Sequence, residues 1–217
     1  MNYFSQHSLE HLPSRQRANL INTITGYKSA NLIATRTPQG TTNLAIFNSV
    51  IHLGSNPALL GFVLRPLTIR RHTYDNLKAT SCFTVNAITQ EMYREAHHTS
   101  AKYPENESEF SMTSFTESYK DGFEAPYVQQ SPIQIGCRYV NEYEIKENGC
   151  ILMVGAVEHI YVVPGLLHED HWAQLDRAKI MSVVGIDGYA LPELEDRLAY
   201  ARPNLTQKSI LDGPQEG

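Results

Sequence analysis

The most regular pattern in the chain is an alternation of apolar and polar positions in its second half. Ile133, Ile135, Cys137, Tyr139, Asn141, Tyr143 and Ile145 occupy every second position. A period of two predicts a β-strand. Asn148-Gly149 then offers a tight turn, and Cys150–Val163 returns as a second apolar run, so the pair predicts a long hairpin. Gly155 in the returning strand marks a bend or the close approach of another backbone.

The first half of the chain predicts further short strands. Ser29–Thr35 is apolar and is followed by a turn at Thr37–Gly40. Two more apolar runs, Asn43–Ile51 and Ala58–Leu64, are separated by the turn Gly54-Ser55-Asn56-Pro57. Strand follows strand here without an intervening helix, which favours antiparallel pairing.

The remaining segments are more polar. Thr89–Ala101 has few apolar positions and is at best a surface helix. Lys102–Gln130, rich in Ser, Glu, Pro and Tyr, is longer than an ordinary connection and predicts an excursion with short helical turns, a lid or an interface arm. Glu169–Ser182, with the only tryptophan, predicts a helix, and the tail from Arg202 onward is expected to fray.

These elements together predict one domain over residues 1–217, with a barrel core at about 20–165 and a C-terminal helix and tail at 166–217. The fold class is mainly β with peripheral helices. Closure into an antiparallel barrel would remove the exposed edges that an open sheet leaves. A strict alternation of strand and helix is missing, which disfavours a doubly wound fold.

Composition narrows the class of protein. A net charge of -5 argues against nucleic acid as the main partner, and 19% charged with 41% hydrophobic residues fits a soluble globular domain. No apolar run reaches the roughly 18 residues of a membrane helix, and the first residues lack a signal-peptide core. We therefore expect a cytoplasmic protein without a membrane partner. Cys82, Cys137 and Cys150 lie in apolar or alternating runs, which predicts buried free thiols.

Several common catalytic and nucleotide-binding motifs are missing. The sequence has no Gly-x-Gly-x-x-Gly, no Gly-Lys-Ser/Thr loop, no Gly-x-Ser-x-Gly elbow and no Cys-x-x-Cys pair. His168 and His171 could stand one helical turn apart, but a third metal ligand is not obvious, and a solvated acidic helix start is the favoured interpretation. No metal site is predicted.

A basic stretch reverses the acidic balance of the chain. Arg65, Arg70, Arg71 and Lys78 stand there against Asp75 alone. Thr73 occupies an N-cap position, with Tyr74–Thr80 as a short helix behind it, and a helix N-terminus favours a phosphate group. The arginines would add bidentate donors. A solvated loop before an ordinary capped helix explains the same residues, so both interpretations stay open.

A second candidate region is polar at the end of an apolar strand. Phe47-Asn48-Ser49, with Ser55-Asn56-Pro57 in the following turn, offers amide and hydroxyl groups beside an apolar wall. Such groups could meet the edge of a heteroaromatic ring. The alternative is that they end one strand and make the turn to the next.

The order of these features resembles the flavin reductase-like family of FMN-binding split β-barrels. The resemblance is carried by Asn43, Phe47-Asn48-Ser49, Gly54-Ser55-Asn56-Pro57, Arg65-Pro66, Arg71-His72-Thr73 with Asn76, and Phe83-Thr84-Val85-Asn86. Two later motifs, Gly155-Ala156-Val157 and Asp187-Gly188-Tyr189, also contribute to the resemblance. Two departures stand out. Many relatives have an acidic residue where this chain has His72, and the turn Ser55-Asn56-Pro57-Ala58 replaces a double proline.

The resemblance implies a homodimer with one FMN per protomer and redox chemistry with NADH or NADPH, reducing flavin or a small acceptor. Phe47, Asn48 and Ser49 would line the flavin ring, with Ser55, Asn56 and Pro57 beside it. The phosphate would be held by Arg71, His72, Thr73 and Arg65, with Asn76 as a buttress.

No catalytic acid, base or nucleophile is needed, because a flavin carries the electron transfer itself. His52 and His159 are the histidines nearest this site, although a lone strand histidine is more often structural. Two alternatives stay open. One is an FMN-binding electron carrier reduced by a protein partner, and the other is a non-redox β-barrel that binds another anionic ligand.

Overall fold

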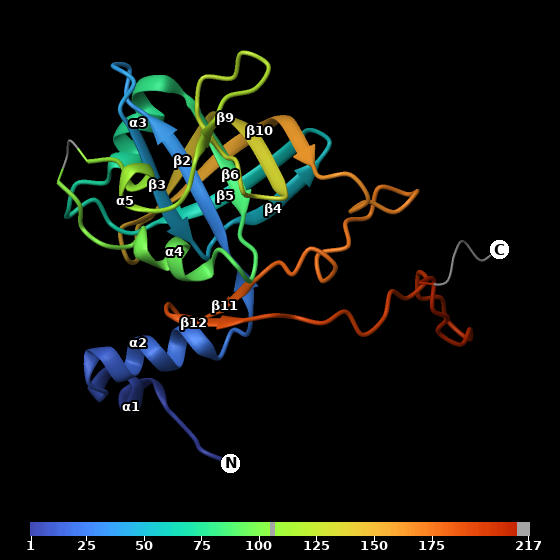
Figure 1. The fold of residues 1–217 in the computed structure, drawn as a ribbon. Helices are drawn as coiled ribbons and strands as arrows, with labels where there is room; N and C mark the ends of the chain where they lie inside the picture. The colour runs from blue at the N-terminus through green and yellow to red at the C-terminus, as the bar shows by residue number, and fades with distance from the viewer. Residues whose placement is uncertain (105–106, 212–217) are drawn as a thin grey trace.

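The computed structural model describes residues 1–104 and 107–211. Its centre is a curled antiparallel sheet of seven strands in the order β3-β2-β6-β9-β10-β5-β4 (Figure 1). The strands are β2 (Asn31–Arg36), β3 (Thr42–Phe47), β4 (Ile51–Ser55), β5 (Ala58–Leu64), β6 (Cys82–Ala87), β9 (Ile133–Ile145) and β10 (Cys150–Val162). The mainly β, antiparallel fold class predicted from the sequence is confirmed.

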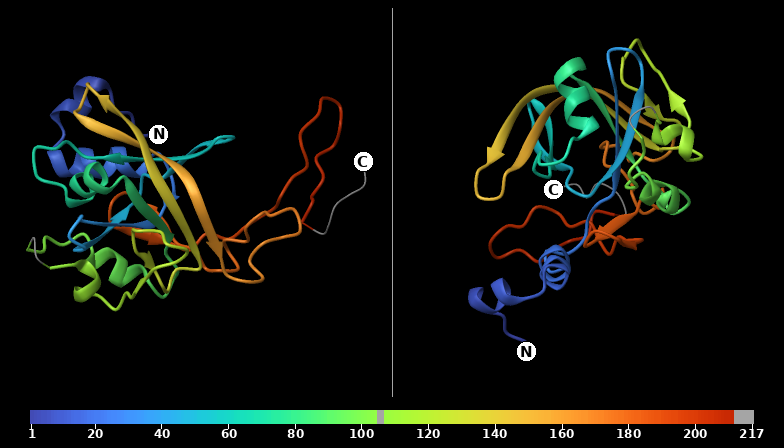
Figure 2. Two further views of the ribbon diagram at one scale, coloured as in Figure 1. Left: turned by 90° about the horizontal axis from the view of Figure 1, so that it is seen from above. Right: turned by 90° about the vertical axis from the view of Figure 1, so that its left-hand side faces the viewer.

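Two smaller sheets and several short helices surround the barrel. The three-stranded sheet is formed by β1 (Lys28–Ser29), β11 (Ser182–Val184) and β12 (Gly188–Ala190), and the two-stranded sheet by β7 (Glu117–Ser118) and β8 (Tyr127–Val128). The helices are α1 (Gln6–His11), α2 (Ser14–Thr23), α3 (His72–Thr80), α4 (Tyr93–His98) and α5 (Glu109–Met112). Figure 2 shows α1, α2 and the C-terminal segment projecting from the compact part of the chain.

The long hairpin is formed as the alternation predicts. β9 and β10 pair from Cys150↔Ile145 to Val162↔Ile133, and Gly149 has the positive φ (71°) that the turn requires. The connection holds four residues, 146–149, so the turn is longer than a two-residue one. Gly155 marks a close approach, although the neighbour is the ring of Phe83 and not another backbone.

Strand β2 is buried on both faces, and this divides the core. Ile33 points into the barrel interior with Phe62, Phe83 and Met153. Leu32 and Ala34 point to the outer side, where α4, α5 and β11 cover them with apolar side chains. Because both faces are buried, the sequence of this strand is a continuous apolar run and does not alternate between apolar and polar residues.

Four predictions about individual elements are wrong, two of them about strands and turns. The run Asn43–Ile51 is not one strand, because Ser49 leaves the β3 direction and bonds to Val63 through its hydroxyl. The β4–β5 pairing continues to Ser55↔Ala58, so only Asn56 and Pro57, joined by a cis peptide bond, make the turn.

The other two errors concern helices. α3 begins at His72, and Thr73 does not cap it, because the Thr73 hydroxyl is buried against Asn43. The predicted helix Glu169–Ser182 is not formed. His171 and Lys179 have positive φ values of 65° and 51°, which interrupt a helix, and Ile180 bridges instead to Thr89.

The polar segments are more deeply packed than predicted. In Thr89–Ala101 only Tyr93–His98 is helical, and Ala96 is buried there. The 102–130 excursion has the predicted short helix and buries Phe110, Phe115 and Tyr127. In the tail from Arg202, Ser209 bridges back to Leu198, and residues 212–217 lie outside the described part of the chain.

The three cysteines are free, as predicted. Cys82 and Cys137 are buried and Cys150 is partly buried. Burial raises the pKa of the Cys137 thiol to about 12, so little of it is thiolate at neutral pH. These thiols therefore contribute to packing.

A methyl group at Gly155 should destabilise the barrel. A Cβ there would lie 2.5 Å from Phe83 Cζ and 3.3 Å from Cys137 Cβ, and Phe83 is held against Phe62. We expect Gly155→Ala to lower the free energy of unfolding by about 1–3 kcal/mol in urea titrations. Phe83→Leu should relieve part of this loss, so the two changes should be less than additive. Full additivity would contradict the proposed contact.

Candidate functional site

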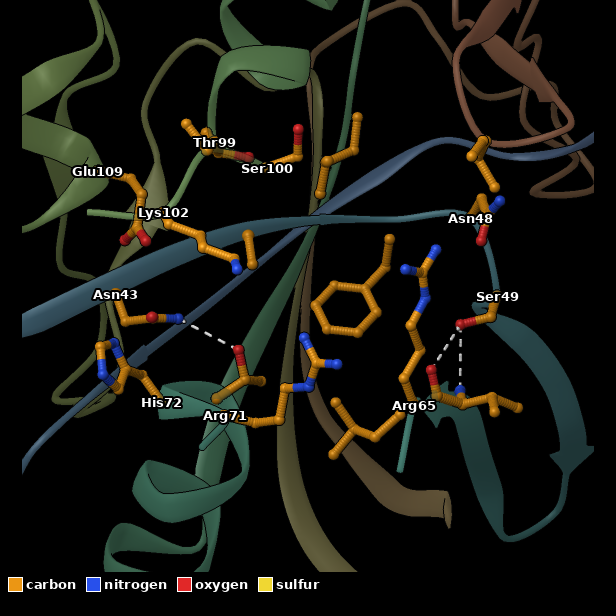
Figure 3. A pocket seen from close by; sticks show the side chains of 18 of the residues that line it. Asn43, Asn48, Ser49, Arg65, Arg71, His72, Thr99, Ser100, Lys102 and Glu109 are labelled. Atoms are coloured by element: carbon orange, nitrogen blue, oxygen red, sulfur yellow. Dashed lines mark hydrogen bonds between the residues drawn. The ribbon is translucent and has the colours of Figure 1, made fainter. Parts of the chain in front are cut away.

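A cavity of ≈ 590 Å³ opens beside β3, at the end of β5 and the start of α3. The loop after α4 and the sheet β11–β12 complete its walls (Figure 3). Its lining residues are Asn43, Ala45, Ile46, Phe47, Asn48, Ser49, Val63, Leu64, Arg65, Arg70, Arg71, His72, Thr73, Thr99, Ser100, Ala101, Lys102, Tyr103, Glu109, Val183, Ile186 and Tyr189. The volume suits a ligand of cofactor size.

One end of the cavity is shaped by the break between β3 and β4. Asn48 Nδ2 donates to the Gly185 carbonyl at 2.8 Å, which ties this break to the turn between β11 and β12. The Ser49 hydroxyl donates to the Val63 carbonyl and accepts from the Val63 N–H, both at 3.1 Å. Phe47 packs edge-on against Phe62, with 5.2 Å between ring centroids. This end therefore combines an aromatic wall with amide and hydroxyl groups held in place.

The other end is shaped by the first turn of α3. Asn43 Nδ2 donates to Thr73 Oγ1 at 3.2 Å, and both residues are buried. The backbone N–H groups of a helix's first turn have no partner within the helix and favour an anion. Arg71 directly precedes His72, and its Nε is buried without a hydrogen-bond partner among the described residues. A buried guanidinium N–H without a partner points to a missing acceptor.

Positive charge is spread along the cavity. Figure 3 shows Arg65 beside Asn48 and Ser49, Lys102 and His72 on the side of Asn43, and the Arg71 side chain extending between them. Arg70 is also on the wall, but its Nε donates to Asp75 at 2.7 Å in an exposed ion pair. The cavity therefore presents a cationic end near α3 and a second cation near the polar aromatic end.

One carboxyl group faces the cationic end. Glu109, the first residue of α5, accepts a hydrogen bond from the Leu44 N–H through Oε2 at 2.8 Å. Burial raises its pKa, while the Leu44 hydrogen bond and the neighbouring His72 oppose that rise. The carboxyl satisfies a backbone N–H of β3, which lies at the edge of the sheet.

The cavity brings together seven of the eleven residues predicted from the sequence: Phe47, Asn48, Ser49, Arg65, Arg71, His72 and Thr73. Ser55, Asn56 and Pro57 form the end of the β4–β5 hairpin and do not line it. Asn76 does not line it either. Its side chain is buried and donates to Thr35 Oγ1 at 3.0 Å, which ties α3 to β2.

The histidines considered from the sequence lie outside the cavity. His52 Nε2 is 3.1 Å from Ser55 Oγ on the exposed strand β4. His159, on β10, packs against the ring of Phe123. His168 lies beside Trp172, and the described residues contain no group of three His, Cys, Asp or Glu side chains that could hold a metal ion.

Several parts of the wall were not predicted as site residues, Glu109 on α5 among them. Residues 99–103 follow α4 in a polar segment whose sequence carries no ligand motif. Val183, Ile186 and Tyr189 come from the small sheet, more than a hundred residues after Phe47. The Asp187-Gly188-Tyr189 motif was the available signal for Tyr189.

A family model described as the flavin reductase like domain matches residues 27–176. The chain belongs to the flavin reductase-like family. No curated protein matches it. The family assignment confirms the resemblance inferred from the sequence.

Several solved structures are similar to this chain. A split-barrel protein from Shewanella frigidimarina NCIMB 400, provisionally named a flavin reductase, is 38% identical with a TM-score of 0.90 and covers 93% of this chain and 100% of its own. Nitrilotriacetate monooxygenase component B from Bacillus cereus is 19% identical, with a TM-score of 0.80 and coverage of 91% and 98%. An FMN-binding protein from Thermus thermophilus is 15% identical, with a TM-score of 0.69 and coverage of 93% and 99%.

These likenesses confirm the split barrel of the flavin reductase-like family. β3 and β4 are the two edges of the seven-stranded sheet, and the break at Asn48–Val50 separates them. Across residues 1–104 and 107–211, no helix has the length and apolar character needed to cross a membrane.

Glu109 should make stability depend on pH. Its folded-state pKa is raised above the ordinary 4.5, so the folded chain retains a proton that the unfolded chain releases. The free energy of unfolding should therefore fall as pH rises from 4.5 through the raised pKa. Glu109→Gln keeps an acceptor for the Leu44 N–H and should reduce that fall in urea titrations between pH 4.5 and 7.

Glu147→Gln, in the exposed β9–β10 turn, is the matched control and should leave the pH dependence as it is in the wild type. An identical profile for wild type and Glu109→Gln would show that Glu109 is not the group responsible.

Proposed function

We propose that this flavin reductase-like protein binds FMN and works as an NAD(P)H-dependent oxidoreductase that reduces flavin or a small acceptor. The observation that carries the proposal is the buried Arg71 Nε without a partner, at the cationic end of a cavity whose other end offers Phe47, Asn48 and Ser49. Such a cavity suits a ligand that is anionic at one end and planar at the other. FMN has that shape.

The residues divide between the two ends of this ligand. Arg71, with the first-turn N–H groups of α3, His72 and Thr73, would hold the phosphate, and Lys102 faces the same end. Phe47, Asn48 and Ser49 would line the ring, and Asn76 would hold α3 in place through Thr35. Arg65 belongs with the ring end because it lies beside Asn48 and Ser49. Ser55, Asn56 and Pro57 are left out because they do not line this cavity.

A single phosphate group fits the charge of the cationic end better than a diphosphate. Glu109 faces this end with a buried carboxyl group, which would oppose a second phosphate lying beyond the first. The argument favours FMN over FAD. The name of the Thermus thermophilus relative, an FMN-binding protein, agrees with this choice.

When bound, the flavin would supply the electron transfer, and the protein would bind and orient it. Asn48 and Ser49 have side chains fixed by bonds to Gly185 and Val63, so they would meet a ring edge at little entropic cost. Arg65 at this end would favour negative charge on a reduced ring. We further propose that the protein is a cytoplasmic homodimer, in keeping with its free thiols.

Anaerobic mixing tests the activity directly. Purified protein with FMN should lose the oxidised flavin absorbance on addition of NADH or NADPH, and acid should release FMN from protein loaded with it. Tight FMN binding with slow reduction by both nucleotides would favour the electron-carrier alternative. Failure of FMN to raise the melting temperature at concentrations far above a plausible dissociation constant would favour a non-redox ligand.

Two arginine variants should separate the phosphate end from the ring end. We expect Arg71→Ala to weaken binding of oxidised FMN by about 10- to 100-fold, because a hydrogen bond to a charged group contributes about 1.5–3 kcal/mol. Arg65→Ala should weaken it less. Fluorescence titration of FMN measures both, and binding of riboflavin, which lacks the phosphate, should not respond to Arg71→Ala.

Arg138→Ala is the matched control, because Arg138 pairs with Glu158 on the barrel surface away from the cavity. Equal losses for FMN and riboflavin with Arg71→Ala would remove that residue from the phosphate site.

A further inference from the structure

The chain exposes more surface than a compact protein of its mass. Its accessible surface is 13,721 Å², whereas folded monomers of this mass expose about 10,000 Å². The surplus exceeds the roughly 800 Å² that each partner buries in a standard protein interface. This much surplus surface is expected of a chain that buries part of itself against another molecule.

Part of the projecting surface belongs to the C-terminal arm, residues 191–211. Figures 1 and 2 show it leaving β12 and extending away from the barrel. Large apolar side chains along it are uncovered: Leu194 is 38% exposed, Leu198 54%, Leu205 64% and Tyr200 91%. Uncovered aromatic and aliphatic side chains in one segment are typical of an interaction surface.

The arm holds a defined shape although it is remote from the core. Ala199 N–H donates to the Lys208 carbonyl at 2.9 Å, and Ile210 N–H donates to the Arg197 carbonyl at 2.8 Å. Arg197 forms an ion pair with Asp170 and lies 4.9 Å from the Trp172 ring centroid. These contacts fix the arm as a projecting loop with its apolar side chains already presented.

An apolar groove lies at the base of the arm. Its volume is ≈ 450 Å³, and its walls include Trp172, Leu175, Ile180, Met181, Pro192 and Leu194. Pro192 and Leu194 belong to the arm itself, so the groove and the arm form one continuous apolar surface. Each copy of the chain therefore carries both a projecting apolar segment and an apolar groove.

We propose that two copies of this chain exchange their C-terminal arms, with the arm of each copy packed on the groove face of the other. A two-fold axis beside the arm bases would cover both arms and both grooves at once, because a two-fold interface uses the same surface twice. A small ligand in the groove would leave Tyr200 and Leu205 exposed. The inference rests on the homodimer proposed above and adds where its copies meet.

Arm exchange would connect assembly to the cofactor cavity. β12 carries Tyr189 on the cavity wall and continues directly into the arm. The Tyr189 hydroxyl lies 3.0 Å from His97 Nδ1 on α4, so β12 also contacts the helix before the 99–103 wall. Docking of the arm would hold this strand in place, and loss of the dimer should weaken cofactor binding.

The test uses the full-length chain. Sedimentation equilibrium should give twice the 24.5 kDa chain mass at micromolar concentration for the wild type. Leu198→Asp with Leu205→Asp should raise the dimer dissociation constant at least 10-fold. The charge-matched control, Thr206→Asp with Gln207→Asp, changes exposed polar positions of the same arm and should keep the dimer. Circular dichroism melting curves check that all variants fold.

A photo-cross-linker at position 200 tests whether the arm of one copy contacts the groove of the other copy. Benzoylphenylalanine replaces Tyr200, and unlabelled chains are mixed with ¹⁵N-labelled chains before irradiation. Cross-links that join a labelled to an unlabelled peptide near Trp172 or Leu175 are the expected result. A dimer with cross-links only within one chain, or with none, would overturn arm exchange and leave the homodimer standing. A monomer at all concentrations would overturn both arm exchange and the homodimer, whereas the FMN titration described above tests the cofactor proposal separately.

Discussion

The break between β3 and β4 is the constraint on which the cavity depends. The Ser49 side chain shapes this break. Its hydroxyl bonds to both backbone groups of Val63 on β5, where a longer strand β4 would have formed backbone hydrogen bonds. The chain therefore turns away after Phe47, and the seven-stranded sheet has edges at β3 and β4. The opening lies where Asn48 reaches the small sheet through Gly185, so two distant parts of the chain meet at one wall.

Buried amide side chains fix the opposite end of the cavity. Asn43 bonds to Thr73 and Asn76 bonds to Thr35, so the start of α3 is held against β3 and β2 by two buried contacts. Leu77 on the same helix packs in the barrel interior. An unpaired buried amide would be costly, which makes the position of α3 well determined. These two contacts therefore set where the Arg71 guanidinium and the first-turn N–H groups lie on the cavity wall.

Local sequence patterns predicted the elements whose residues face one environment along their length. The β9–β10 hairpin followed from strict alternation and a glycine with positive φ. β5 followed from a short apolar run between turns. The predictions failed where a side chain bonds to a group far away in the sequence. Ser49 ends a strand that the apolar run Asn43–Ile51 would have continued, because its hydroxyl bonds to the Val63 backbone. The buried Thr73 hydroxyl, predicted as a helix cap, accepts a hydrogen bond from the Asn43 side chain.

The sequence by itself determined the antiparallel barrel and the family, because strand periodicity, turn residues and the cluster from Asn43 to Asn86 are local signals. The tertiary structure decided which of those residues share a cavity. It placed Arg65 beside Asn48 and Ser49, moved Ser55–Pro57 to a hairpin end, and added Lys102, Glu109 and Tyr189 from later segments. The physical reason is that a cavity wall is built from contacts between distant segments, and such contacts leave no period or spacing in the sequence.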